Sequence, residues 1–410
     1  MTKEEFLNLA ERLLEEARCV LHNDLSIPKV RFGWTEIQMP VVTCDEFTKN
    51  RLKDFLFRVK PPGKMLEAIP QQDSLRDISL KLLDLGVVYI ELSQLQHAFE
   101  MRLMHTISMM IQNEEIKRED IIIHLKMPPR KTRIEFEKNL SKLWNEHLNK
   151  LDFIDLFSFH IVGKNYETDW VLDKKDDMCY AAAVEFQNEG KIRSIGFSTD
   201  RSVENTMRLI CSNNFEYVNL YYHFLGREIC GHENFSNLTC IKKALDLDMG
   251  VLSFSPFTRG GMLYKASKTC ILTMSEKISP LSYAILQSWE AGIHSSIINS
   301  GNMISIIDAP ENIDLSSPGK IDSFIKVQER MIVILKSKLC EEWFQKGLLN
   351  LPSYQDKVSH GVDISYILWL HNLLITFGLF DFCKKHYKIL EANKSVWNNK
   401  ISFEENIKHM

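Results

Sequence analysis

Three side chains that could share one active site stand at the ends of three apolar runs. Glu91, Lys126 and His160 each close a short stretch rich in Ile, Val, Leu and Phe. A carboxylate, an ammonium and an imidazole that converge would shift one another's pKa values, as the groups of acid–base sites do. Taken singly, Lys126 could be a solvated strand end and His160 a hydrogen-bonded structural histidine. Three such residues at successive strand ends predict an active site.

The elements that must position these side chains alternate along the chain. From about residue 40 to 300, short β-branched runs are separated by amphipathic helical stretches such as 133–148 and 203–211. The predicted strands are 39–43, 87–91, 121–126, 153–160, 192–196, 217–220, 250–254 and 295–298. Eight β-then-α units predict an α/β fold, a closed parallel (β/α)8 TIM barrel. A doubly wound open sheet is the alternative, and the lack of a Gly-rich turn after the first strand counts against it.

The barrel is expected to occupy residues 31–310, between two helical flanks. Residues 1–30 read as an N-terminal amphipathic helix. After residue 310 the alternation stops, and two long helical patterns, 321–348 and 363–390, predict a C-terminal extension over residues 311–410.

Composition limits the class of partner and the compartment. The 410 residues are 45% hydrophobic and 25% charged, with a net charge of −4 and no basic patch, so nucleic acid is not an expected partner. The longest apolar run, 364–380, is short for a membrane span and contains His371 and Asn372. Nine cysteines without a C-x-x-C spacing suit neither disulfides, nor a metal site, nor an iron–sulfur cluster. We expect reduced thiols, in the cytoplasm or another reducing intracellular compartment.

Three long segments resemble the aldo-keto reductase superfamily. Residues 151–160, LDFIDLFSFH, are similar to the family's fourth strand with its active-site histidine, and 189–199, EGKIRSIGFST, to the segment of the fifth. Residues 249–264, MGVLSFSPFTRGGMLY, are similar to strand seven and the loop after it. The resemblance covers roughly 31–310. It implies hydride transfer from NADPH to the carbonyl carbon of a small-molecule substrate.

The resemblance implies a role for each candidate catalytic residue. Lys126 matches the lysine that lowers the pKa of a proton-donating tyrosine, Glu91 the carboxylate that pairs with it, and His160 the histidine that orients the carbonyl. The tyrosine is expected five residues after the carboxylate, where this chain has Gln96. A glutamine amide is no general acid at neutral pH. His97 could substitute for the tyrosine, or it could be an ordinary histidine. Tyr89, two residues before Glu91 on the same side of its strand, is a second candidate, but it would sit deeper in the barrel.

One part of the implied cofactor site is retained. Ser198 and Thr199 match the pair that holds the nicotinamide carboxamide, and Asn219 stands where relatives have a glutamine with that duty. Phe254 takes the aromatic position that stacks on the ring, and Ser255 follows it at the strand end. The same residues have plainer interpretations: Phe254 could fill the barrel mouth, and Ser198 and Thr199 could cap the next helix.

The rest of the implied cofactor site has diverged. The first turn, Gly-rich in relatives, reads CDEF at 44–47, and its carboxylates would repel phosphates. The last loop, 299–303, has no cation for a 2′-phosphate, although Ser300 and Gly301 could offer backbone donors. Arg259 could contact the pyrophosphate or lie on the surface. The NADP(H) site is therefore expected to be weakened.

Two functions remain open from the sequence. The first is an NADP-dependent oxidoreductase with reduced activity, whose proton source is His97 or water. The second is a catalytically inactive barrel, a pseudoenzyme that serves as a scaffold, as a subunit of a complex with a protein partner, or as a nucleotide-sensing protein.

Overall fold

The structure is a computed structural model that describes the eight strands and most of the helices around them. The described residues are 27–44, 76, 79–80, 83, 86, 88–93, 98–160, 162, 165–199, 203–222, 237–254, 278, 280–298, 318–339, 364–380, 383–384 and 387. The predicted N-terminal helix lies almost wholly outside this set. Its last two residues, Lys29 and Val30, belong to a strand.

Eight parallel strands follow one another in the order β3-β10-β9-β8-β7-β6-β5-β4, and the two end strands, β3 and β4, lie against each other. The predicted (β/α)8 barrel is confirmed. The strands are β3 (Val42–Cys44), β4 (Tyr89–Ser93), β5 (Ile122–Met127), β6 (Ile154–Phe159), β7 (Ile192–Thr199), β8 (Tyr217–Tyr221), β9 (Gly250–Phe254) and β10 (Ser295–Ile298).

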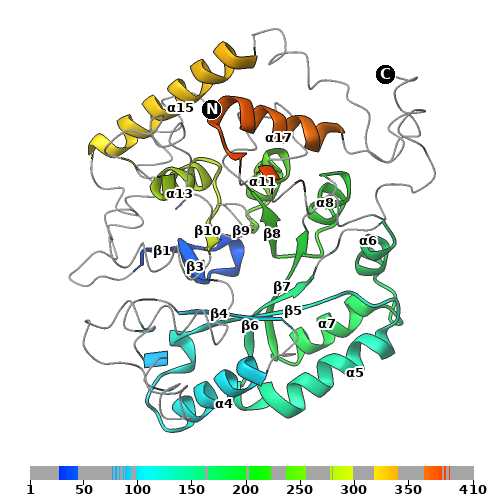
Figure 1. Ribbon diagram of the computed structural model, residues 1–410. Helices are drawn as coiled ribbons and strands as arrows, with labels where there is room; N and C mark the ends of the chain where they lie inside the picture. The colour runs from blue at the N-terminus through cyan, green and yellow to red at the C-terminus, as the bar shows by residue number, and fades with distance from the viewer. Residues whose placement is uncertain are drawn as a thin grey trace. The chain divides into compact units, whose positions relative to one another are not determined.

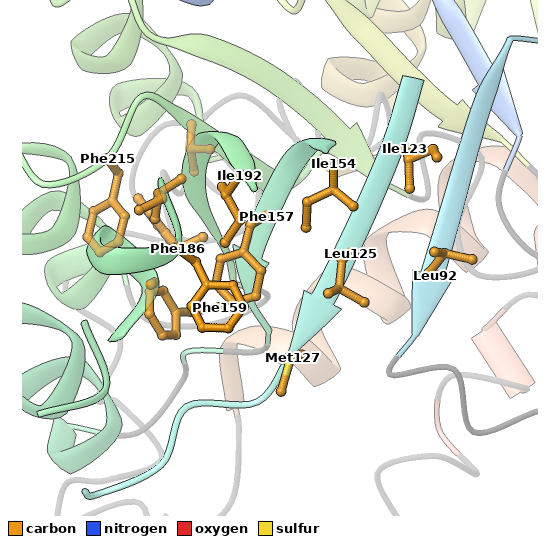
Figure 2. Packing of buried hydrophobic residues seen from close by; sticks show 14 of the residues in the cluster. Leu92, Ile123, Leu125, Met127, Ile154, Phe157, Phe159, Phe186, Ile192 and Phe215 are labelled. Atoms are coloured by element: carbon orange, nitrogen blue, oxygen red, sulfur yellow. The ribbon is translucent and has the colours of Figure 1, made fainter. Parts of the chain in front are cut away.

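Helices cover the outer face of the strands, as Figure 1 shows for α4, α5 and α7 beside β4–β7. The helices of this part of the chain are α4 (Ala98–Gln112), α5 (Arg133–Leu143), α6 (Asn165–Leu172), α7 (Cys179–Asn188), α8 (Val203–Ile210), α11 (Leu238–Asp246) and α13 (Pro280–Glu290). A π-helical turn, Trp144–Leu148, continues α5 to the end of the predicted helix. The side chains between strands and helices are apolar, and Figure 2 shows Leu125, Phe157 and Phe159 in that layer.

The two-residue period of each strand sorts side chains between this outer layer and the barrel interior. On β4, Ile90 and Leu92 belong to the outer cluster, while Tyr89 belongs to the inner one. Glu91 shares the inward face with Tyr89. On β4 the inward positions thus carry the polar side chains Tyr89 and Glu91, whereas the outward positions carry isoleucine and leucine.

A short hairpin adjoins the amino end of the barrel. Strands β1 (Lys29–Arg31) and β2 (Gln38–Pro40) pair antiparallel around a 3-10 turn, η1 (Gly33–Thr35). Phe32 is completely buried, and its ring lies 5.7 Å from that of Tyr217, at the start of β8. At Gly250, where β9 begins, a Cβ would come within 2.6 Å of the Phe32 ring, so only glycine fits there.

The hairpin corrects the predicted first strand, 39–43. Met39 and Pro40 belong to β2, and the barrel strand begins only at Val42. Pro40 has no backbone N–H and cannot donate to a sheet ladder, so it suits the end of a hairpin strand rather than the middle of a barrel strand.

The chain divides into two compact units, and the second contains the C-terminal helices. The first unit is 1–222, 237–261 and 285–316, and the second is 223–236, 262–284 and 317–410. Within the second, α15 (Pro318–Leu339) packs against α17 (Ile364–Phe377). The helix predicted over 363–390 is interrupted after Phe377, where Gly378 takes a positive φ of 62° that terminates helices. The residues described beyond that break, at 380, 383, 384 and 387, are helical again. No helix in the described part of the chain is long and apolar enough to cross a membrane.

Candidate active site

The carboxyl end of the barrel holds a buried ion pair between two predicted residues. The Nζ atom of Lys126 lies 2.6 Å from Oε2 of Glu91, and the two side chains are 5% and 13% exposed. They come from neighbouring parallel strands, in which Ser93 of β4 is in register with Lys126 of β5. Glu91 therefore lies one inward position below the lysine and accepts from its ammonium group.

His160 follows β6 and faces the next strand. Its Nδ1 lies 2.6 Å from the hydroxyl oxygen of Ser198, near the end of β7. The backbone N–H of His160 donates to the carbonyl of Met127 at 2.7 Å, which fixes it beside the end of β5. Glu91, Lys126 and Ser198 lie on β4, β5 and β7, and His160 directly follows β6, so the four residues come from four consecutive strands of the barrel.

Asn219, the next predicted residue round the barrel, carries an unsatisfied amide. It is in register with Ser198 on β7, and its side chain is completely buried. Among the described residues, neither its Nδ2 nor its Oδ1 has a hydrogen-bond partner. A buried amide without partners costs about 1–3 kcal/mol, so this position suits a ligand group that both donates and accepts.

Phe254 ends β9 and is partly exposed. Its ring lies 5.8 Å from that of Tyr221, the residue beside it in register on β8. Tyr221 was not among the predicted site residues, although it follows Asn219 by two positions and so shares its face. Thr199 is buried at the end of β7.

Six of the predicted site residues lie outside the described residues: Gln96, His97, Ser255, Arg259, Ser300 and Gly301. Asp45 and Glu46 of the first turn lie outside them as well. Their parts in catalysis or cofactor binding stay predictions.

Of the buried polar cluster beneath the ion pair, sequence reasoning points only to Tyr89, and the other members were missed. The hydroxyl of Tyr89 donates to Oε2 of Glu91 at 3.1 Å and lies 2.5 Å from Nδ1 of His124. On the other side of the imidazole, Nε2 of His124 lies 2.7 Å from the Ser158 hydroxyl and 3.1 Å from that of Tyr217. The signal was present in the alternation, since Tyr89 and His124 each stand two residues before a predicted site residue.

Burial sets the protonation state of this cluster. It lowers the pKa of His124 well below its usual value, and the positive charge of Lys126 lowers it further. Burial also raises the pKa of Tyr217. At neutral pH the imidazole and the phenol are therefore both uncharged, and Glu91 and Lys126 form an ion pair above a neutral hydrogen-bonded layer.

A family model described as the aldo/keto reductase family matches residues 64–278. The chain belongs to this family. The match spans more than half of the sequence and includes Glu91, Lys126, His160, Ser198 and Asn219. Members of the aldo/keto reductase family commonly bind NADP(H) and act as oxidoreductases.

Solved aldo-keto reductases are also similar to the chain. A Pseudomonas aeruginosa protein described as an aldo-keto reductase is 15% identical, covers 72% of this chain and 98% of its own, and has a TM-score of 0.48. One from Brucella melitensis is 16% identical over 74% of this chain and 100% of its own, with a TM-score of 0.47. A Bombyx mori aldo-keto reductase in complex with NADP is 16% identical over 74% and 93%, with a TM-score of 0.46. No curated protein matches the chain.

Metal-ligating residues do not gather in the described part of this family member. There, no group of three or more His, Cys, Asp or Glu side chains is arranged to hold a metal ion. The candidate chemistry of the described residues thus lies in the ion pair, in His160 and in the amide of Asn219.

Proposed function

We propose that this protein binds NADP(H) at the carboxyl end of its barrel and reduces a carbonyl compound with low turnover. The observation that carries the proposal is the buried pair of Lys126 and Glu91, with Nζ and Oε2 at 2.6 Å. A cation that is 5% exposed costs free energy unless it is paired. The barrel holds this one at the end where active sites of the fold lie.

The described residues fit a nicotinamide on one observation. The amide of Asn219 is buried and has no partner among the described residues, and a carboxamide would satisfy both its donor and its acceptor. Asn219 and Ser198 would hold the carboxamide, and Phe254 would lie against the ring. The cofactor, when bound, supplies the hydride.

The side chains of this protein would act on the carbonyl oxygen. The Lys126 ammonium and the His160 imidazole lie on neighbouring elements and would place N–H donors toward that oxygen, which polarises the carbonyl. Hydride addition leaves an alkoxide that must take up one proton to become the alcohol. With Gln96 at the tyrosine position, that proton would come from His97 or from water, and turnover would be slow.

A second function is favoured by Gln96 itself. A barrel that binds the nucleotide without turnover would keep Asn219 and Ser198 but not the proton donor. It would then work as a nucleotide-sensing protein or as a subunit of a larger complex. The two functions share the binding step and differ in the chemical step.

Titration of the purified protein with NADPH, followed by nicotinamide fluorescence, tests the shared step. We expect saturable binding that is weakened at least about tenfold in Asn219→Leu, because the carboxamide loses both hydrogen bonds. Ser295→Ala is the matched control, since it removes another buried polar atom without a hydrogen-bond partner among the described residues, the hydroxyl oxygen of Ser295 on β10. No binding at millimolar NADPH would overturn both functions. Binding without oxidation of NADPH over a panel of aldehydes and ketones would leave only the second.

A further inference from the structure

The buried cluster beneath the ion pair is continuous across the barrel interior. Tyr89 from β4, His124 from β5, Ser158 from β6 and Tyr217 from β8 are each at most 1% exposed. Ser158 and Tyr217 are themselves joined at 2.9 Å between their hydroxyl oxygens. The cluster therefore links four strands and reaches Glu91 through the Tyr89 hydroxyl.

The number of protons available decides which atom donates in each contact. Glu91 is a carboxylate paired with Lys126, so it can only accept, and Tyr89 must donate to it. A hydroxyl has one proton. Tyr89 must then accept at its short contact with His124, and Nδ1 of His124 must be the atom that carries hydrogen.

The other side of the imidazole follows from the same accounting. A neutral imidazole that carries hydrogen on Nδ1 has an acceptor at Nε2. Ser158 makes the shorter contact with Nε2, at 2.7 Å, and donates to it. Tyr217 then donates to the Ser158 oxygen. Every hydroxyl proton of the cluster is used once.

We propose that His124 is held as the Nδ1–H tautomer, and that Tyr89 and His124 are thereby positioning residues for Glu91 and Lys126. The donors run in one direction, from Tyr217 through Ser158, His124 and Tyr89 to the carboxylate. Oε2 of Glu91 receives both the Tyr89 hydroxyl and the Lys126 ammonium. The carboxylate is fixed from below, and it fixes the ammonium above it.

The tautomer is a property of the fold and does not depend on catalysis. The consequence for Lys126 deepens the proposed function, because it names the residues that aim the ammonium at the substrate. Two measurements separate these parts, and neither needs NADPH.

The first measurement is the ¹⁵N NMR spectrum of the full chain labelled at histidine, recorded at pH 7.5. The His124 signals are assigned by their loss in His124→Asn. We expect an Nδ1 with a directly bound proton and an Nε2 without one. A proton on Nε2 would overturn the proposal, whether or not Nδ1 also carries one. If His124→Asn does not fold, His124→Gln gives the same assignment.

The second measurement follows Lys126 by ¹³C NMR of the chain labelled at the lysine Cε, with Lys126→Arg for assignment. Asparagine at position 124 places an amide N–H near the Nδ1 position, whereas glutamine places its amide near the Nε2 position. His124→Asn should therefore leave the Lys126 signal close to its wild-type shift. His124→Gln and Tyr89→Phe should both move and broaden it.

If His124 only fills space in the core, the two substitutions at position 124 should affect the Lys126 signal alike. Equal displacement of the Lys126 signal by asparagine and glutamine would show that the donor at Nδ1 has no special part, and it would contradict the positioning role. Failure of wild-type protein to bind NADPH would remove the proposed function and leave both NMR results standing.

Discussion

Lys126 has one ion-pair partner, Glu91, in the described part of the chain. Removing one member of a buried pair leaves the other charge uncompensated. Lys126→Met should therefore lower the free energy of unfolding by about 3–5 kcal/mol. The double variant Lys126→Met/Glu91→Gln removes both charges and keeps an acceptor for Tyr89, so it should recover at least about 2 kcal/mol of that loss. Urea unfolding followed by circular dichroism measures both. A double variant no more stable than the single one would contradict the ion pair.

The proposal that Gln96 stands in the place of the proton donor can also be tested with one residue. If the rest of the site is intact, Gln96→Tyr should raise the turnover of NADPH with the best carbonyl substrate about 100-fold or more, because a positioned general acid contributes 10²–10⁴-fold. The rate is read from the loss of NADPH absorbance. Gln96→Phe is the matched control, since it adds the ring without the hydroxyl. Equal rates in the two variants would show that the phenol does not reach the substrate.

At the scale of elements, the hairpin of β1 and β2 depends on one buried ring. Phe32 is completely buried, while Trp34, two residues later, is 53% exposed. Phe32→Ala should destabilise the barrel by about 3–5 kcal/mol, and Trp34→Ala by about 0.5 kcal/mol. Differential scanning calorimetry compares them. Similar melting temperatures for the two variants would mean that the hairpin does not pack on the barrel as described.

The elements also show how far the sequence predicts this fold. β9 and β10 have the bounds that their apolar runs predict. A strand that is buried on both faces is a nearly continuous apolar run, so its ends are visible in the sequence. The first barrel strand was placed too early because the run continues through Pro40 into the hairpin. The sequence predicted both Glu91 and Lys126 as strand ends. Lys126 does lie near the end of β5, but β4 runs on to Ser93, so Glu91 stands in the middle of its strand. Their contact follows from the pairing of the two adjacent strands.

The inner polar cluster could not be predicted in the same way. Its contact between His124 and Tyr217 joins residues 93 positions apart. Only the closed curvature of the sheet brings β5 and β8 close enough for it. The hydrophobic pattern around Tyr217 predicts that its side chain is buried in the core. It does not predict which group forms a hydrogen bond with the Tyr217 hydroxyl.

At the scale of the whole molecule, His124 gives the stability a dependence on pH. In the unfolded chain its pKa is about 6.5, and in the folded chain burial holds the pKa well below that value. Below pH 6.5 the unfolded chain thus binds one more proton. The free energy of unfolding should fall by up to about 1.4 kcal/mol per pH unit as the pH drops toward the folded pKa.

The difference between wild type and His124→Asn isolates this one proton, because the other titrating groups are common to both proteins. Urea unfolding at pH 8, 7, 6 and 5 should give stabilities whose difference narrows below pH 6.5, as the wild type loses its advantage. A constant difference over that range would show that His124 takes up its proton over the same pH range in the folded and the unfolded chain, and it would contradict the lowered pKa.

The ion pair at the barrel mouth also bears on how such a chain drifts away from catalysis over generations. A tyrosine at position 96 can be exchanged for glutamine without leaving an unpaired charge, because both side chains are neutral at pH 7. Lys126 and Glu91 have no such route, because either single loss passes through a poorly folded intermediate, and only a paired replacement avoids it. A lineage released from selection on turnover would therefore shed the proton donor early and carry the lysine and the carboxylate long afterwards. In a descendant barrel, the charged pair would therefore indicate common ancestry and a requirement for folding, whereas the residue at position 96 would indicate whether the reaction is retained.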